Sequence, residues 1–165
     1  MVVAIGIDPG IVHTGVVGMH LAPIEHEVYL EERLIMGYNP QEVKHAVDDI
    51  RSGFPKYLNS HIFIEKYRPR SHFSYDNQMS TAVSEIHKAL PGSKVLANTG
   101  IKKVVRPALL HALQLDKFKQ ASHHQDLLSA ARIMILGLLK NEEANRQLSE
   151  FVIDIMNGRD WHVYK

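Results

Sequence analysis

The stretch Ile5-Gly6-Ile7-Asp8-Pro9-Gly10 decides how this chain folds. It closes an apolar run that begins at residue 2, which is typical of a buried strand, and Pro9-Gly10 ends that strand directly after the carboxylate. A second apolar run, 15–19, starts four residues later, so we expect a hairpin with Asp8 at its rim. An Asp can cap its own turn, whereas a carboxylate at the end of a central strand costs free energy unless it is paired or bound to a cation. The choice between these roles depends on whether other acids reach the same place.

Length and composition limit the class of protein. A chain of 165 residues, 45% hydrophobic and 22% charged, is ordinary for a soluble globular protein, and we expect one domain over 1–165 with a helical extension at about 141–165. No apolar run is long enough to span a membrane and we find no signal peptide, which favours a cytoplasmic location. The chain has no Cys, which excludes a disulfide framework, a thiolate metal site and a Cys nucleophile.

The net charge of +1 hides an asymmetry along the chain. Residues 1–65 hold 4 Lys/Arg and 9 Asp/Glu, whereas residues 66–119 hold 10 Lys/Arg and 3 Asp/Glu. Loops are often rich in Lys for solubility, but a basic middle segment beside an acidic one favours a polyanion partner such as nucleic acid.

Apolar periodicity and breakers predict an α/β protein with a mixed sheet of about five strands flanked by helices. The expected strands are 2–8, 14–20, 26–36, 62–64 and 94–97, with a peripheral strand or docked end at 161–164. The expected helices begin at Pro40 after an Asn39 cap and at Gln78, Ser122 and Asn141, with partly helical structure over 101–115 around Pro107 and a loop over 66–77.

Three more residues repeat the placement of Asp8 at an element's end. Glu65 directly follows the apolar run 62–64, and Asp126 lies early in the long helix, before small residues that would let the helix pack close to the sheet. His123 lies three residues before Asp126 and so shares its helix face. Each could be an ordinary surface or helix-start residue. Together they occupy the strand ends and helix start where α/β folds place their sites, and an oxygen-rich cluster selects hard cations such as Mg²⁺ or Mn²⁺.

Three segments resemble the motifs of the RuvC family of Holliday junction resolvases. They are Gly6-Ile7-Asp8-Pro9-Gly10-Ile11-Val12-His13-Thr14-Gly15, Ile62-Phe63-Ile64-Glu65 and Asp126-Leu127-Leu128-Ser129-Ala130-Ala131. Their order and spacing hold across residues 1–140, and the short chain resembles the compact versions carried by bacteriophages of lactic-acid bacteria. The glycine-rich stretch that cellular members have before the last helix is not evident, and residues 102–107 stand there instead, so we do not expect a cellular-type sequence preference.

The resemblance implies a ribonuclease H-like fold, a homodimer, and metal-dependent nicking of four-way junctions and other branched DNA. The implied catalytic and metal-ligating residues are Asp8, Glu65, His123 and Asp126, with two Mg²⁺ or Mn²⁺ ions per site. Asp8 would bridge both ions, Glu65 would hold one, and Asp126 with His123 or a water would hold the other. The helix 78–90 is the implied dimer interface, although its apolar face is equally typical of an ordinary core helix.

Basic and aromatic residues alternate directly after Glu65, a composition suited to gripping phosphates and stacking on unpaired bases. Aromatic side chains of such a loop can also fold back onto the core. In the family an aromatic residue of this loop helps to open the junction, and Tyr67 and Phe73 are equal candidates here. The predicted DNA contacts are Lys66, Tyr67, Arg68, Arg70 and Phe73, with a second basic cluster at Lys102, Lys103 and Arg106.

Two other functions fit the same residues. One is a ribonuclease H-like nuclease that acts on forks, flaps or RNA–DNA hybrids, and the other is a branched-DNA-binding protein with weak cleavage. The sugar-kinase and actin-like ATPases also open with an Asp-bearing hairpin, but they need a second lobe for which 165 residues leave no room.

Overall fold

A mixed sheet of six strands organises the part of the chain that the computed structural model describes, residues 1–56, 59–69, 71, 73–119 and 124–165. The order across the sheet is β5-β4-β1-β2-β3-β6. β1, β2 and β3 form an antiparallel meander, while β4 lies parallel to β1, β5 parallel to β4 and β6 parallel to β3. The strands are β1 Val2–Asp8, β2 His13–Ala22, β3 Glu27–Met36, β4 Ser60–Lys66, β5 Lys94–Ala97 and β6 His162–Tyr164.

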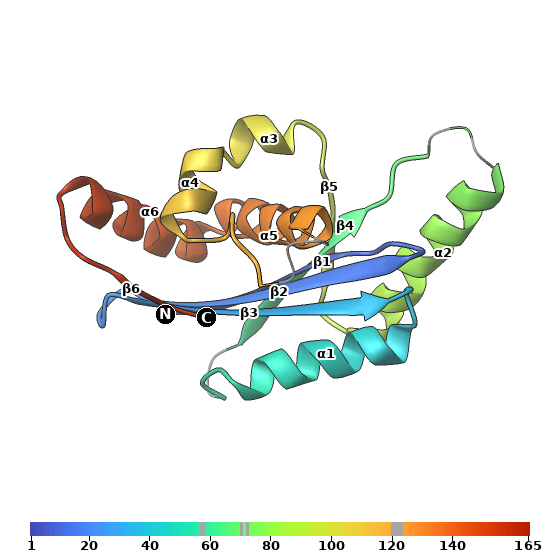
Figure 1. The fold of residues 1–165 in the computed structure, drawn as a ribbon, viewed down its shortest axis with the longest axis horizontal. Coiled ribbons are helices and arrows are strands. Elements are labelled where there is room, and N and C mark those ends of the chain that lie inside the picture. Colours follow the sequence, from blue (N-terminus) through green and yellow to red (C-terminus); the bar gives the residue numbers. More distant parts are fainter. Residues whose placement is uncertain (57–58, 70, 72, 120–123) are drawn as a thin grey trace.

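Helices cover both faces of the sheet (Figure 1), so the predicted α/β class is confirmed. α5, α6 and the short helices α3 and α4 pack on one face, and α1 and α2 pack on the other. No helix in the described part of the chain combines the length and apolarity that a membrane crossing requires. The helices are α1 Pro40–Ser52, α2 Phe73–Ala89, α3 Ile101–Val104, α4 Pro107–Ala112, α5 His124–Leu139 and α6 Glu142–Met156.

The loop predicted over 66–77 is wrong in its second half, because α2 begins at Phe73. Its first turn is polar and carries no apolar period, so the sequence pattern could not reveal it. Asp76 lies in this turn, where the helix dipole favours an acid. Pro107 does start a helix, as expected, whereas the predicted Ser122 cap lies outside the described residues.

The apolar face of α2 belongs to the core of the monomer. Met79, Val83 and Ile86 are buried, and Val83 and Ile86 join the cluster that includes apolar residues of α1. The ordinary core alternative is therefore confirmed for this face, and a dimer interface at helix 78–90 stays a prediction. A side chain already buried within its own chain is not available to a second copy.

Glycines in the sheet let α5 approach it closely. A Cβ on Gly15 would lie 2.6 Å from the backbone oxygen of Asp126, and one on Gly6 would overlap the backbone oxygen of Ala130. Both distances are far inside van der Waals contact, so larger residues cannot stand at either position without moving the helix. This packing sets the first turn of α5, and Asp126 with it, over the ends of β1 and β2.

Candidate active site

Strand alternation and register bring the first two predicted acids together. Val2 and Ala4 of β1 belong to the core cluster that includes α5, as does Phe63 of β4, so side chains two residues apart on each strand face α5. Asp8 and Glu65 continue these two series. Ile7 pairs with Ile64 in the parallel ladder, which leaves the two carboxylates at neighbouring strand ends.

Asp8, Glu65 and Asp126 line one cleft with a volume of about 750 Å³. The three acids come from β1, β4 and α5. His13, Asn98 and Ser129 line the same cleft, as do Lys66, Tyr67 and Arg68 from the segment after Glu65. His123 and Arg70, the other predicted members of the site, lie outside the described residues.

The electrostatics of the cleft disfavour its negative charge. Burial raises the pKa of Asp8 well above its ordinary value, and the charges of Glu65 and Asp126 raise it further, against a hydrogen bond from the Ser129 hydroxyl. Burial also raises the pKa of Glu65, while a hydrogen bond from Asn98 and the charge of Arg132 oppose this shift. A bound cation would relieve the repulsion that both carboxylates experience.

The donor set fits a hard divalent cation in its chemistry. Carboxylate oxygens are the ligands that Mg²⁺ and Mn²⁺ prefer, and all three acids face the same cleft. Among the described residues, however, no three acidic or His side chains are gathered at metal-ligand spacing. Ligation therefore requires the acidic side chains to draw together. The Oε1 atom of Glu65 accepts a hydrogen bond from Nδ2 of Asn98.

The turn after Asp8 is held by Thr14. The Thr14 hydroxyl donates to the Gly37 backbone oxygen at 2.7 Å and accepts from the Gly10 backbone nitrogen at 3.4 Å. A Cβ on Gly10 would overlap the His13 backbone oxygen, so glycine is required there. The turn-capping role considered for Asp8 thus falls to Thr14, which leaves the Asp8 carboxylate facing the cleft.

The structure separates the two aromatic candidates of the basic segment. The Tyr67 hydroxyl donates to the carboxylate of Asp76 in α2, and its ring packs against the core cluster of α1 and α2. Phe73, the first residue of α2, is 83% exposed. Tyr67 therefore supports the fold of the segment, whereas the Phe73 ring is accessible from solvent.

The second basic cluster lies beyond the cleft. Lys102 and Lys103 are exposed on α3, and exposed Arg106 precedes α4. None of these residues lines the cleft. They follow closely in the sequence on Asn98, which does line the cleft.

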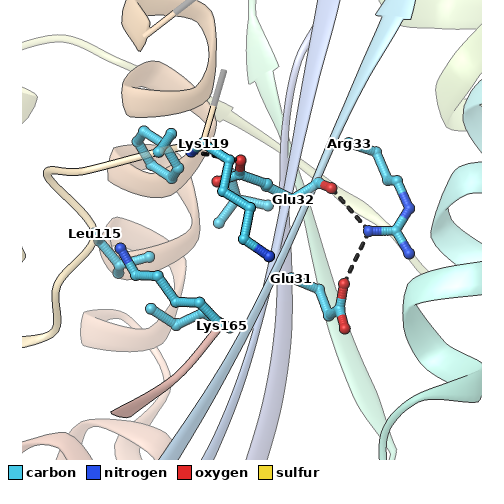
Figure 2. Close-up of a pocket in the computed structure, with 9 residues that line it drawn as sticks. Glu31, Glu32, Arg33, Leu115, Lys119 and Lys165 are labelled. Carbon is cyan, nitrogen blue, oxygen red and sulfur yellow. Dashed lines mark hydrogen bonds and ion pairs between the residues drawn. The ribbon is translucent and has the colours of Figure 1, made fainter. Parts of the chain in front are cut away.

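A second cavity, of about 310 Å³, lies at β3 near the C-terminus (Figure 2). The Lys119 backbone nitrogen donates to Glu32 Oε1 at 2.8 Å, and Arg33 Nη1 donates to Glu31 Oε2 at 2.8 Å. The Lys165 ammonium donates to the backbone oxygens of Gln114 and Lys117. The charged groups of this cavity are thus held by the pairing of Arg33 with Glu31 and by backbone hydrogen bonds, which tie the chain end to the segment before α5. We therefore assign the functional site to the acidic cleft.

Sequence reasoning assigned no role to several residues of the cleft, among them Asn98, Ser129 and His13. Asn98 could have been found from the alternation of β5, because it lies two residues after Leu96 of the α5-side core. Ser129 lies three residues after Asp126 and so shares its helix face. His13 carried no signal of its own, because only the hairpin geometry turns the start of β2 toward Asp8.

Comparisons with known proteins find similarity at the level of fold. The sequence matches no protein-family model and no curated protein. The structure is similar to that of Thermus thermophilus RuvC in complex with a Holliday junction substrate, with a TM-score of 0.57 and 15% identity over 81% of this chain and 92% of that one. Another T. thermophilus RuvC structure gives a TM-score of 0.45 and 21% identity over 79% and 92% of the two chains. The structure of the yeast mitochondrial Holliday junction resolvase Ydc2 gives a TM-score of 0.44 and 11% identity over 92% of this chain and 82% of that one. The chain thus has the ribonuclease H-like α/β fold of the first of these proteins.

Proposed function

We propose that this protein is a structure-specific DNA endonuclease that nicks four-way junctions by metal-assisted phosphodiester hydrolysis. The observation that carries the proposal is the convergence of Asp8, Glu65 and Asp126, from three elements, on one cleft. The fold supports it, because T. thermophilus RuvC, solved with a Holliday junction substrate, shares this arrangement of sheet and helices. The proposal includes two further points: that the protein is of the compact type carried by bacteriophages, and that it acts in the cytoplasm.

The acids of the cleft would hold the metal. Asp8 lies on the strand between β4 and β2 and its pKa is raised by the charges of both other acids, so it is our choice for the shared ligand. Glu65 would hold one ion, and Asp126, with His123 three residues earlier in the sequence, the other. Bound Mg²⁺ or Mn²⁺ supplies activation of the attacking water and stabilisation of the leaving oxyanion. Ser129 orients Asp8 through its hydrogen bond.

The basic residues around the cleft would position the DNA. Lys66 and Arg68 line the cleft itself and would contact the phosphates next to the cleaved bond. Arg70, two residues after Arg68 in the sequence, is proposed as a further DNA contact. Lys102, Lys103 and Arg106 would hold the backbone of an outgoing arm. The exposed ring of Phe73 is our choice for the residue that stacks at the junction centre, because the Tyr67 ring already packs against the core.

Two symmetric nicks require two active sites, so we propose a homodimer as the working unit. Its interface must use surfaces other than the buried face of α2. In a two-fold dimer each copy would present one acidic cleft to one of the two strands that are cut.

The substitution Asp8→Asn tests the catalytic assignment. It keeps the size of the side chain and removes one ligand charge, so we expect nicking of a labelled four-way junction in Mg²⁺ to fall by at least about 1,000-fold. Junction affinity in the absence of divalent metal should stay within about twofold, because Asp8 contributes no positive charge to DNA binding. Strong residual nicking by this variant in Mg²⁺ would contradict the assignment.

The substrate class is tested by comparing three labelled substrates in Mg²⁺ and then in Mn²⁺. These are a four-way junction, a fork and an RNA–DNA hybrid. Paired symmetric nicks confined to the junction support the proposal. Preferred cutting of the fork or hybrid supports the related nuclease activity, and junction binding without nicks in either metal supports a branched-DNA-binding protein.

A further inference from the structure

The turn that follows β5 forms hydrogen bonds with Glu65, near the end of β4, and with Arg68, just after β4. The Asn98 Nδ2 atom donates to Glu65 Oε1, and the Arg68 guanidinium donates to the Thr99 hydroxyl. The parallel register explains the pairing, because Leu96 lies opposite Glu65 and Ala97 opposite Lys66. The chain that leaves β5 therefore runs alongside the chain that leaves β4 and forms hydrogen bonds with its Glu65 and Arg68 side chains.

The same turn leads directly into α3 and the second basic cluster. The backbone nitrogen of Ile101 donates to the Asn98 backbone oxygen at 3.0 Å, and Lys103 donates to the Gly100 backbone oxygen at 2.9 Å. Gly100 has a φ of 70°, a conformation that glycine adopts without strain. Lys102 and Lys103 are thus joined to Asn98 by a short hydrogen-bonded turn.

The chemistry of asparagine suits this position in an acidic cleft. Its amide can donate a hydrogen bond to a carboxylate without adding a charge of either sign. An aspartate would add a further negative charge, and a lysine would compete with a cation for Glu65. A neutral donor fixes the carboxylate and leaves its charge and its second oxygen for a ligand.

We propose that Asn98 is a positioning residue, which holds the Glu65 carboxylate for cation binding and links it to the basic segment that begins α3. The role in DNA cutting rests on the proposed function, whereas the role in cation binding does not. Partners of metal ligands outside the coordination sphere typically contribute 10–100-fold to metal affinity or activity. The Asn98 bond also opposes the effect of burial on the pKa of Glu65.

The first experiment uses Mn²⁺ as the probe and the protein without DNA. The Tm is followed during a Mn²⁺ titration for the wild type, Asn98→Ala, Asn98→Asp and the control Asn157→Ala, which alters an exposed residue at the end of α6. For Asn98→Ala we expect the Mn²⁺ concentration that gives half of the Tm shift to rise about tenfold. Asn157→Ala should match the wild type. The proposal is overturned if Asn98→Ala has the same half-shift Mn²⁺ concentration as the wild type. It is also overturned if millimolar Mn²⁺ does not change the Tm of the wild type.

A double-mutant cycle with Glu65→Gln shows whether Asn98 acts through Glu65. We expect Asn98→Ala to shift the Mn²⁺ midpoint by less than about twofold in the Glu65→Gln background. An equal shift in both backgrounds overturns the positioning role. The fold of each variant is first checked by far-UV circular dichroism and by its Tm in EDTA. If Asn98→Ala lowers the metal-free Tm, it does so in both backgrounds, and the cycle still isolates the part of the Mn²⁺ effect that depends on Glu65.

Nicking assays complete the test. With saturating junction, Asn98→Ala and Asn98→Asp should both cut about 10–100-fold more slowly, with junction affinity in EDTA within twofold of the wild type. Wild-type cutting by Asn98→Asp would mean that an oxygen ligand suffices and would overturn the donor role. If the wild type cuts no branched DNA but the Mn²⁺ coupling between Asn98 and Glu65 is found, the proposed function fails and the positioning role stands.

Discussion

The acidic half of the candidate site (Asp8, Glu65 and Asp126) and its basic half (Lys66 and Arg68, which line the cleft, and Phe73 further along the chain) are held in different ways. The acids lie at the ends of paired central strands and on a helix that packs tightly on the sheet. Lys66 ends β4, and the rest of the basic half lies beyond that strand. Lys66, Arg68 and Phe73 are exposed, and contacts such as the Arg68 hydrogen bond to Thr99 hold the segment. Under the proposed function, DNA cutting and DNA binding are therefore separable by mutation, because the acids depend on the packing of the core and the basic half on surface side chains.

The acidic half should collapse when the packing of α5 is broken. A valine at Gly15 would place its Cβ 2.6 Å from the Asp126 backbone oxygen, so Gly15→Val must displace the helix or the strand. We expect the free energy of unfolding, measured with urea, to fall by about 3 kcal/mol or more. Any folded fraction should bind DNA and cut poorly, because Asp126 no longer lies over the end of β1.

Gly53→Ala is the matched control for this substitution. Gly53 has a φ of −78° at the end of α1, and a Cβ there would meet ordinary contact distances. We expect a change within about 0.5 kcal/mol. Equal losses in the two variants would contradict the view that close packing of α5 is what assembles the acids.

The basic half should respond in DNA binding and not in stability. Phe73→Ala removes an exposed ring, so the Tm should change little, whereas junction affinity should fall about tenfold, the lower part of the range for a base-stacking ring. Tyr67→Phe should lower the Tm and leave junction affinity nearly unchanged, because it removes only the hydroxyl that donates to Asp76. Binding to labelled junction and thermal unfolding are measured on both variants. An affinity loss in Tyr67→Phe with none in Phe73→Ala would reverse our choice between the rings.

The acidic half was also the more predictable of the two from sequence. Asp8 and Glu65 stand at the ends of apolar runs, where alternation and breakers are strong signals, and the small residues after Asp126 predicted the close helix. The start of α2 was missed because its first turn is polar. The Asn98 bond to Glu65 and the Tyr67 bond to Asp76 depend on how separate segments meet in space, which a local pattern does not encode.

The smallest expected effect is the pH-dependent contribution of Asp8 to the folding stability of the protein. The pKa of Asp8 is raised in the folded protein from its ordinary value of 3.8, so the folded state favours the protonated acid. That contribution is complete below the unfolded pKa and is lost as the pH rises through the folded pKa. Above the unfolded pKa the fold therefore loses stability through Asp8, and Asp8→Asn, which removes this titration, should raise the Tm in EDTA at neutral pH by a few °C, the change that about 1 kcal/mol produces in a domain of this size.

The pH dependence distinguishes this cause from a general effect of the substitution. The Tm difference between Asp8→Asn and the wild type should shrink toward zero as the pH falls below 3.8, where Asp8 becomes protonated in both states. Exposed Asp160→Asn serves as the control and should show no such trend. Adding Mn²⁺ at neutral pH should raise the Tm of the wild type more than that of Asp8→Asn, because a ligand that binds only the folded state stabilises it. A Tm difference that is constant across pH would mean that the Asp8 charge does not strain the cleft, and the repulsion that we assign to the three acids would have to be abandoned.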